Sequence, residues 1–284
     1  MSITNQNPNN FCNKYKNFGL ACLRKFIDDY LKSAKKDTSE INSTTISKIR
    51  KEIIKEAENK SFNLSLTKAV MEETKNALLA LDYDVIDVTA RLDYKAISGM
   101  SEGLFHLIFE VGLNYDELLD VPYIPGSTIK GIMRSRLYEL TKNKGEELFG
   151  PLNNIGKDNA WKGKIVVSDA YPIPNNKNNN SEEAKLLTGD ILNPHYYKNN
   201  EAVKSEYEVM PTPIIHISIR DNVKFRFLIG IEKNANPGEA GKILNVKSAK
   251  ELVMILLLYS LKTGMGARST KGYGFFEVED FLVM

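Results

Sequence analysis

The chain has 284 residues, of which 42% are hydrophobic and 26% are charged, and its formal net charge is +2. This composition excludes a wholly disordered protein, because the apolar content is sufficient to bury a large core. The near balance of charges indicates that any contact with nucleic acid is a local basic patch rather than a property of the whole surface.

Cysteine and histidine are too few and too scattered for the common disulfide and metal sites. Cys12 and Cys22 cannot form a disulfide framework, so we expect a reducing, cytoplasmic environment. The histidines His106, His195 and His216 lack metal-ligand spacing, so neither a metal nor another cofactor is expected. The N-terminal residues lack the pattern of a signal peptide, and no apolar run could span a bilayer, so no membrane partner is expected.

The N-terminal part of the chain is predicted to be helical. Apolar and aromatic side chains recur at helical spacing over residues 11–36, around 46–57 and over about 66–81. Their lysines are interleaved with glutamates, which is typical of a solvated face. We therefore predict a helical N-terminal region over residues 1–82 and a separate domain over residues 83–284.

Predicted strands and helices alternate in the second part. An asparagine-rich insertion is expected over about 174–210. Two strands flanking Asp221-Asn222 are expected to form a hairpin. The predicted helices cover 127–142 and 247–262, and the predicted strands cover 84–94, 104–113, 164–170, 214–219, 224–231 and 274–283.

This order of elements predicts an α+β fold, with an antiparallel sheet and helices on one side of it. The succession of strand, hairpin, helix and strand occurs loosely in both halves of the domain. It indicates either two ferredoxin-like units or one such unit with large insertions.

A first candidate site is the segment Pro125-Gly-Ser-Thr-Ile-Lys-Gly131. Ser127 is predicted to cap a helix there, and a helix start offers N–H groups and a positive dipole end to a phosphate. Lys130 and Arg134 fall on the same face as Ser127, whereas Arg136 projects from the apolar stripe and is expected to meet a carboxylate or another subunit. The alternative is an ordinary capped surface helix with solvated lysines.

A second candidate site runs from Gly264 to Gly274 and joins a predicted helix to the terminal strand. Its glycines let the backbone fold around a ligand, its basic and hydroxyl side chains suit phosphate, and its aromatic ring suits a base. These side chains are Arg268, Ser269, Thr270, Lys271 and Tyr273. The spacing fits neither a Walker A loop nor a dinucleotide-binding fingerprint. The alternative is a glycine-capped helix end and a flexible hairpin.

A third segment, residues 188–197, contains Asp190 and His195. These residue types suggest general acid–base catalysis. No nucleophile accompanies them at a known spacing, so contact between His195 and RNA or a partner protein is favoured over catalysis.

Together, IPGSTIKGIMR (124–134) and GARSTKGYG (266–274) resemble the two hallmark motifs of the RAMP (repeat-associated mysterious protein) superfamily of CRISPR proteins, in the superfamily's order. KIVVSDAYP (164–172) and GDILNPHYY (189–197), followed by the PTPI stretch, are similar to the family of sixth subunits of type III-B (Cmr) complexes. The resemblance covers about residues 85–284 well and the preceding part only loosely.

The resemblance implies a ferredoxin-like, RRM-like RAMP fold and a non-catalytic, RNA-binding role in a guide-RNA ribonucleoprotein. In that family the subunit caps the backbone filament near the 3′ end of the crRNA. The implied partners are crRNA, target RNA, the backbone RAMP subunit, the other large RAMP subunit and the small helical subunits. The residues matched by position are Gly126, Ser127, Lys130, Arg134, Gly264, Gly266, Arg268, Lys271, Gly272 and Gly274.

One departure from the superfamily pattern lies at the front of the loop, where many members have a further glycine and this chain has Ala267 and Arg268. Two alternative functions stay open. One is a RAMP endoribonuclease that processes guide RNA with His195 or His106 as acid or base. The other is the equivalent subunit of a type III-A complex.

Overall fold

The computed structural model describes residues 17–36, 43–101, 103–151, 162–175, 182–193, 197–198, 201–202 and 213–284. It divides into two compact units, each assembled from segments that are distant in sequence. The first unit takes residues 1–61, 99–120 and 185–219, and the second takes 62–98, 121–184 and 220–284. The sequence suggested a single boundary between residues 82 and 83, whereas these units divide the chain at several other positions.

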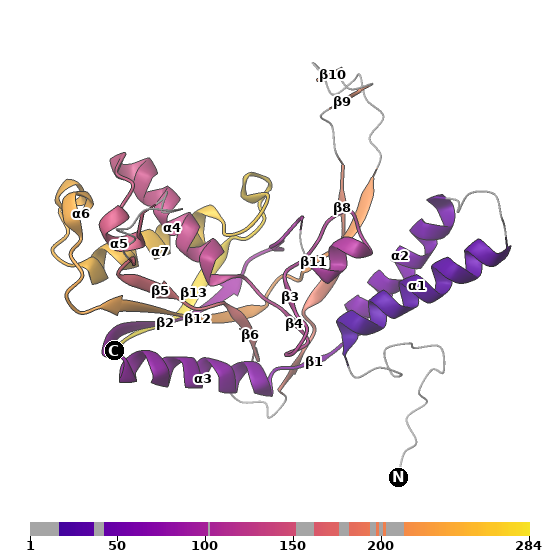
Figure 1. The fold of residues 1–284 in the computed structure, drawn as a ribbon, viewed down its shortest axis with the longest axis horizontal. Coiled ribbons are helices and arrows are strands. Elements are labelled where there is room, and N and C mark those ends of the chain that lie inside the picture. The colour runs from indigo at the N-terminus through magenta and orange to yellow at the C-terminus, as the bar shows by residue number, and fades with distance from the viewer. Residues whose placement is uncertain are drawn as a thin grey trace, which may run out of the picture. The chain divides into compact units, whose positions relative to one another are not determined.

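The second unit is built on a five-stranded antiparallel sheet with the main path β13–β2–β12–β5, and β6 also pairs with β12 (Figure 1). The strands are β2 (Tyr83–Leu92), β5 (Ile165–Val167), β6 (Tyr171–Ile173), β12 (Lys224–Glu232) and β13 (Phe276–Val283). Helix α4 (Gly126–Thr141) follows β2, and helix α7 (Ala249–Thr263) follows β12. This βαββαβ succession, with the fourth strand beside the first and the third beside the second, is ferredoxin-like.

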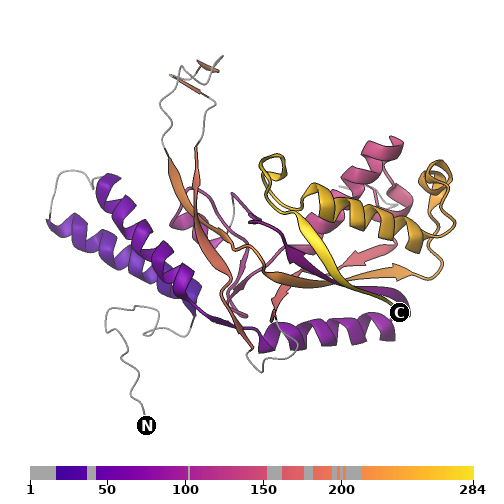
Figure 2. The ribbon, with the colours of Figure 1, turned by 180° about the vertical axis from the view of Figure 1, so that it is seen from behind.

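Helices cover both faces of this sheet. Helix α3 (Ser65–Ala80) packs its Met71 and Leu78 against Val85 and Leu228 on one face. Helices α4 and α7 lie on the opposite face (Figures 1 and 2). The sequence predicted helices on only one side of the sheet. This is correct for α4 and α7, which share one face, but wrong for the second unit as a whole, because α3 covers the other face. Successive residues of β2, Val85 and Ile86, are both fully buried, and they point to opposite faces, so each face needs a cover.

An ion-pair network ties α3 to the sheet. Arg226 donates from Nε and Nη2 to the two carboxylate oxygens of Asp87, at 2.8 and 2.6 Å, and from Nη1 to Glu72 at 2.6 Å. The side chains of Arg226 and Asp87 are 12% and 11% exposed. The hydrogen bonds to Asp87 and then to Glu72 hold the pKa of Arg226 above its ordinary value, despite burial.

The first unit contains helix α1 (Phe18–Lys36), helix α2 (Ser43–Asn59) and a two-stranded antiparallel sheet of β8 (Leu187–Leu192) and β11 (Ile214–Ile219). Ile49, Ile53 and Ala57 of α2 are buried, as their spacing predicts. Helix α2 lies so close to β8 that a Cβ on Gly189 would be 2.5 Å from Ile54 Cγ2. The part of the first predicted helix before residue 17 lies outside the described residues.

Two predictions about strands are wrong. Over the predicted strand 104–113, a 3-10 helix η2 (Leu104–Leu107) is followed by bends, and Phe109 N–H donates to Phe105 O at 2.8 Å. Most apolar residues there are buried, but Leu107 is exposed and the buried positions do not alternate as in a strand, so a composition rich in apolar residues did not indicate the correct element. The strands flanking Asp221-Asn222 form no hairpin, because β11 pairs with β8 in the first unit whereas β12 pairs with β2 in the second.

The remaining elements are short. They are β1 (Phe62–Asn63), β3 (Tyr115–Asp116), β4 (Val121–Pro122), α5 (Glu146–Phe149), β7 (Glu183–Ala184), β9 (Tyr197–Lys198), β10 (Glu201–Ala202), α6 (Gly238–Leu244) and η4 (Ser269–Lys271). β1 pairs with β7, and β9 pairs with β10. Within the described ranges, no helix combines the length and the hydropathy that a bilayer span requires.

Candidate nucleic-acid interface

The start of α4 differs from the sequence prediction. Pro125 is the N-cap residue, in an extended conformation, and Ser127 lies exposed inside the first turn without capping it. The Gly126 N–H instead donates to the carboxylate of Asp169 at 2.7 Å. A carboxylate at a helix N-terminus is stabilised by the helix dipole, so an acidic side chain already occupies part of the expected phosphate site.

Gly126 is required for packing between backbones. A Cβ at this position would lie 2.3 Å from the carbonyl oxygen of Val167 in β5. Gly131 is different, since a Cβ there would meet no atom within 4 Å and the residue is exposed. Gly126 therefore allows α4 to pack closely against β5, whereas the surface beside Gly131 is open.

Two lysines line a groove of about 310 Å³ beside the first turn of α4. Lys130 Nζ donates to the carbonyl oxygen of Ile165 at 2.8 Å, and Lys162 Nζ donates to Tyr83 Oη at 2.9 Å. Burial lowers the pKa of Lys130, and the nearby charges of Arg134 and Lys162 lower it further. Mutually repelling cations beside an open groove are suited to an anion. Lys162 could not be singled out from the sequence, because it belongs to no motif and stands alone in a connecting segment.

Arg134 is held by the backbone of its own unit. Its Nε donates to the Lys144 carbonyl oxygen at 2.8 Å, and its Nη2 is buried without a hydrogen-bond partner among the described residues. Burial lowers the pKa of Arg134. Arg136 meets a carboxylate as expected, donating to Glu139 at 2.8 Å, and its guanidinium lies over the Tyr259 ring.

The glycine-rich loop, residues 264–274, is hydrogen-bonded to itself and to the chain that follows β2. Met265 N–H donates to Gly274 O at 2.7 Å, Ala267 N–H to Ile97 O at 2.9 Å and Gly274 N–H to Lys95 O at 2.8 Å. Gly264 ends α7, as the capped-helix interpretation predicted. The hydrogen bonds favour a structured loop over the flexible hairpin.

Two glycines of this loop show what the backbone requires. Gly274 has φ +73°, and a Cβ there would lie 1.9 Å from Met265 O, so no side chain fits. Gly272 has φ +90°, with no atom within 4 Å of the Cβ position. Arg268 also has a positive φ, 60°, which is a conformation that glycine adopts more readily.

The polar side chains of the loop differ in their access to solvent. Lys271 is exposed, and Arg268 and Ser269 are partly exposed. Tyr273 is only 9% exposed, and its ring packs edge-on against Tyr94 with centroids 5.9 Å apart. Burial therefore leaves Tyr273 little surface for the base stacking that the sequence suggested. Tyr94, which belongs to neither sequence motif, is 50% exposed.

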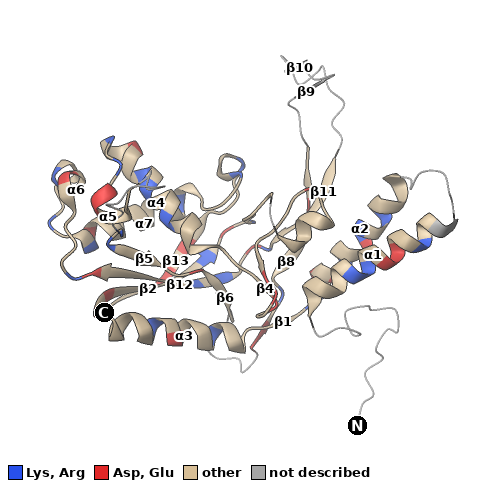
Figure 3. Ribbon diagram, in the orientation of Figure 1, with Lys and Arg blue, Asp and Glu red and all other residues tan. Residues whose placement is uncertain are grey.

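Both motifs belong to the second unit and lie on the face of its sheet opposite α3. Helix α4 packs on α7, and the glycine-rich loop starts where α7 ends. Figure 3 shows Lys and Arg positions on α4 and on the loop. Many cations elsewhere pair with carboxylates, as Lys25 does with Asp29 and Arg50 with Glu110.

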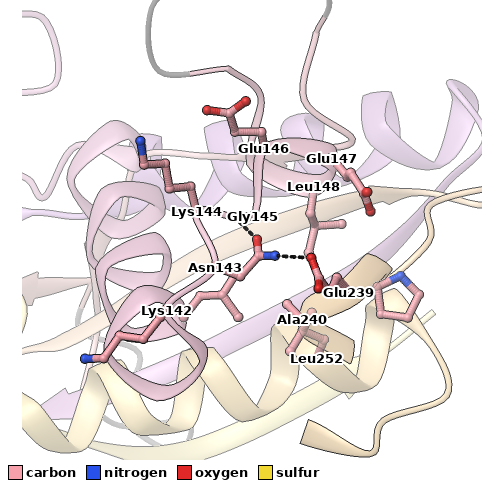
Figure 4. Close-up of a pocket in the computed structure, with 12 residues that line it drawn as sticks. Lys142, Asn143, Lys144, Gly145, Glu146, Glu147, Leu148, Glu239, Ala240 and Leu252 are labelled. Carbon is pink, nitrogen blue, oxygen red and sulfur yellow. Dashed lines mark hydrogen bonds between the residues drawn. The ribbon is translucent and has the colours of Figure 1, made fainter. Parts of the chain in front are cut away.

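A larger pocket, of about 530 Å³, lies between the C-terminal end of α4, α5 and α6 (Figure 4). Asn143 accepts from Gly145 N–H at 2.7 Å and donates to Glu239 at 3.4 Å across it. Its lining mixes lysine and glutamate side chains, and it contains none of the predicted site residues.

The histidines are not gathered at the motifs in the part of the chain described. His195 lies outside the described residues. His106 is exposed on η2 in the first unit, and His216 is buried in β11. Within the described ranges, no cluster of three or more metal-ligating side chains is present.

Comparison with known proteins identifies the family. The family model of the RAMP superfamily matches residues 108–277. The chain belongs to the RAMP superfamily. This RAMP protein is 32% identical over 234 residues to the CRISPR system CMR subunit Cmr6 of Saccharolobus solfataricus, across 81% of this chain and 72% of the relative. It is therefore a homologue of Cmr6.

The RAMP fold is also shared with a chain of the type III-B Cmr-beta complex, whose cryo-EM structure was determined bound to cognate target RNA. The TM-score is 0.67 and the identity is 26%, over 96% of this chain and 95% of that chain. The RAMP family, expected from the two motifs, is thereby confirmed.

Proposed function

We propose that this chain is a non-catalytic, RNA-binding subunit of a type III-B CRISPR (Cmr) RNA-targeting complex, and that it caps the backbone filament near the 3′ end of the crRNA. Its partners are crRNA, target RNA and the other subunits of the complex, in the cytoplasm. Similarity to a Cmr6 subunit and to a chain of a Cmr complex bound to target RNA supports this proposal.

The observation that best supports an RNA-binding role is that four cationic side chains of the two motifs have no carboxylate partner in an ion pair within the described part of the chain. Lys130, Arg134, Arg268 and Lys271 form no ion pair with any described residue. Lys130 and Arg134 instead bond to backbone carbonyls, which fix their positions without neutralising their charges. Positioned cations without carboxylate partners attract the phosphates of a single-stranded guide.

Salt dependence tests this role. Each phosphate contact on a single strand contributes about −0.7 to the slope of log K against log salt concentration. Arg268→Ala with Lys271→Ala should therefore make the slope shallower by about 1.4 and weaken binding to single-stranded crRNA. Lys130→Ala tests the first motif, and Lys242→Ala, an exposed lysine on α6, is the matched control. A slope that stays unchanged in the double variant refutes the assignment of the loop.

A second function, guide processing by an endoribonuclease, is tested separately. The purified protein should leave repeat RNA intact, with or without a divalent metal ion. A defined product that disappears in His195→Ala would overturn the non-catalytic proposal. Purification of the complex with identification of its proteins and RNA tests the partners, and type III-A subunits in place of Cmr subunits would contradict them.

A further inference from the structure

Tyr94 presents an aromatic ring to solvent directly beside the glycine-rich loop. The residue follows the end of β2 and is 50% exposed. Its ring packs edge-on against the buried Tyr273, at an interplanar angle of 70°. This contact restricts the orientations open to the exposed ring, so less rotamer freedom is lost when a ligand binds than for a ring without such a contact.

Cationic side chains are present on the segment that contains Tyr94 and on the loop bonded to it. Lys95 Nζ lies 5.5 Å from the centroid of the Tyr94 ring, and the Lys95 carbonyl accepts the Gly274 N–H at 2.8 Å. The loop bonded to Tyr94's own segment carries Arg268 and Lys271. The acidic neighbour in sequence, Asp93, lies 4.0 Å from the guanidinium of Arg91.

We propose that Tyr94 is a stacking platform for one base of single-stranded RNA, with Lys95, Arg268 and Lys271 binding the flanking phosphates. The proposal rests on the RNA-binding function proposed above and names a residue for it. Single-stranded nucleic acid is held by an aromatic face for the base together with cations for the backbone, and Tyr94 has both around it. Cationic neighbours also favour RNA over an apolar protein surface.

Stacking should be independent of base identity and should require the ring rather than the hydroxyl group. Tyr94→Ala is therefore expected to weaken binding of a single-stranded oligouridylate by roughly tenfold, within the range for loss of one stacked base. Tyr94→Phe should bind like the parent protein. The salt slope should stay unchanged in both variants, because no phosphate contact is lost. Unfolding temperatures of the variants serve as the control for folding.

An RNA strand that lacks bases separates stacking from charge. The parent protein and Tyr94→Ala should bind an abasic strand equally, and both should bind it more weakly than the parent binds oligouridylate. Photo-crosslinking with 5-iodouracil RNA should label Tyr94, which peptide mass spectrometry would locate.

The possible outcomes distinguish base stacking on Tyr94 from the RNA-binding role on which it rests. Salt-dependent RNA binding that is equal in the parent protein and Tyr94→Ala overturns stacking and leaves the RNA-binding role standing. The same result with loss of a co-purifying protein assigns Tyr94 to a protein contact and also refutes stacking. Failure of the parent protein to bind RNA at low salt overturns both proposals.

Discussion

Gly272 and Gly274 form a matched pair that tests how the glycine-rich loop is held. Both have positive φ, so replacing either with alanine costs about 1–2 kcal/mol for the left-handed backbone. At Gly272 nothing lies within 4 Å of the new Cβ, so this is the whole expected cost. At Gly274 the Cβ would lie 1.9 Å from Met265 O, and the backbone must move.

That movement breaks the hydrogen bonds from Met265 N–H to Gly274 O and from Gly274 N–H to Lys95 O. Each contributes about 1 kcal/mol net. Gly274→Ala is therefore expected to cost about 3–4 kcal/mol, against about 1–2 kcal/mol for Gly272→Ala. If the substitution opens only the glycine-rich loop and the rest of the protein stays folded, part of this cost appears as a lower affinity for RNA. The free energy of global unfolding then falls by less than the full amount.

Chemical denaturation and single-stranded RNA binding at fixed salt concentration measure the two effects. We expect Gly274→Ala to be the worse variant in at least one of them by a factor of ten or more. If the two variants agree in both measurements, the loop is not held by the hydrogen bonds described.

Three further predictions concern stability. Arg226→Met should lower the free energy of unfolding by about 3 kcal/mol by leaving Asp87 buried without its partner, and adding Asp87→Leu should restore most of it in the same denaturation assay. Hydrogen bonds from Lys75 and then Arg226 lower the pKa of Glu72. The ionised Glu72 therefore stabilises the folded protein above about pH 4.5, and this stabilisation is lost as the pH falls through the lowered pKa. Glu72→Gln should reduce the fall in melting temperature that acid causes. Ser248→Ala removes the side-chain N-cap of α7 and should cost about 1 kcal/mol, measured by thermal unfolding.

The sequence predicted elements whose signal is local. The spacing of Ile49, Ile53 and Ala57 gave α2, because one buried helical face leaves a period in the sequence. The turn at Asp221-Asn222 was a good local signal for a hairpin, yet its flanking strands join different sheets. Strand pairing depends on partners far along the chain, and β2 and β8 are those partners. No local sequence pattern indicates which of these distant strands each strand pairs with.

The candidate site divides in the same way. The two motifs carry a sequence pattern, so Lys130 and Arg268 could be singled out in advance. Lys162 and Tyr94 could not, because the fold alone brings them to those motifs. Tyr273 was predicted to stack on RNA from its place in the motif, but the same place buries it against Tyr94.

The structure also changes which groups are available to bind phosphate. The sequence suggested backbone N–H groups at the start of α4 and along the glycine-rich loop. Gly126 N–H is already bonded to Asp169, and the N–H groups of Met265, Ala267 and Gly274 are bonded to backbone carbonyls. These four N–H groups are therefore not available to a phosphate in this conformation, which leaves the lysine and arginine side chains of the motifs as the principal phosphate-binding groups that we propose. Binding through lysine and arginine side chains should be more sensitive to salt than binding through a backbone cradle, since each neutralised phosphate releases counterions.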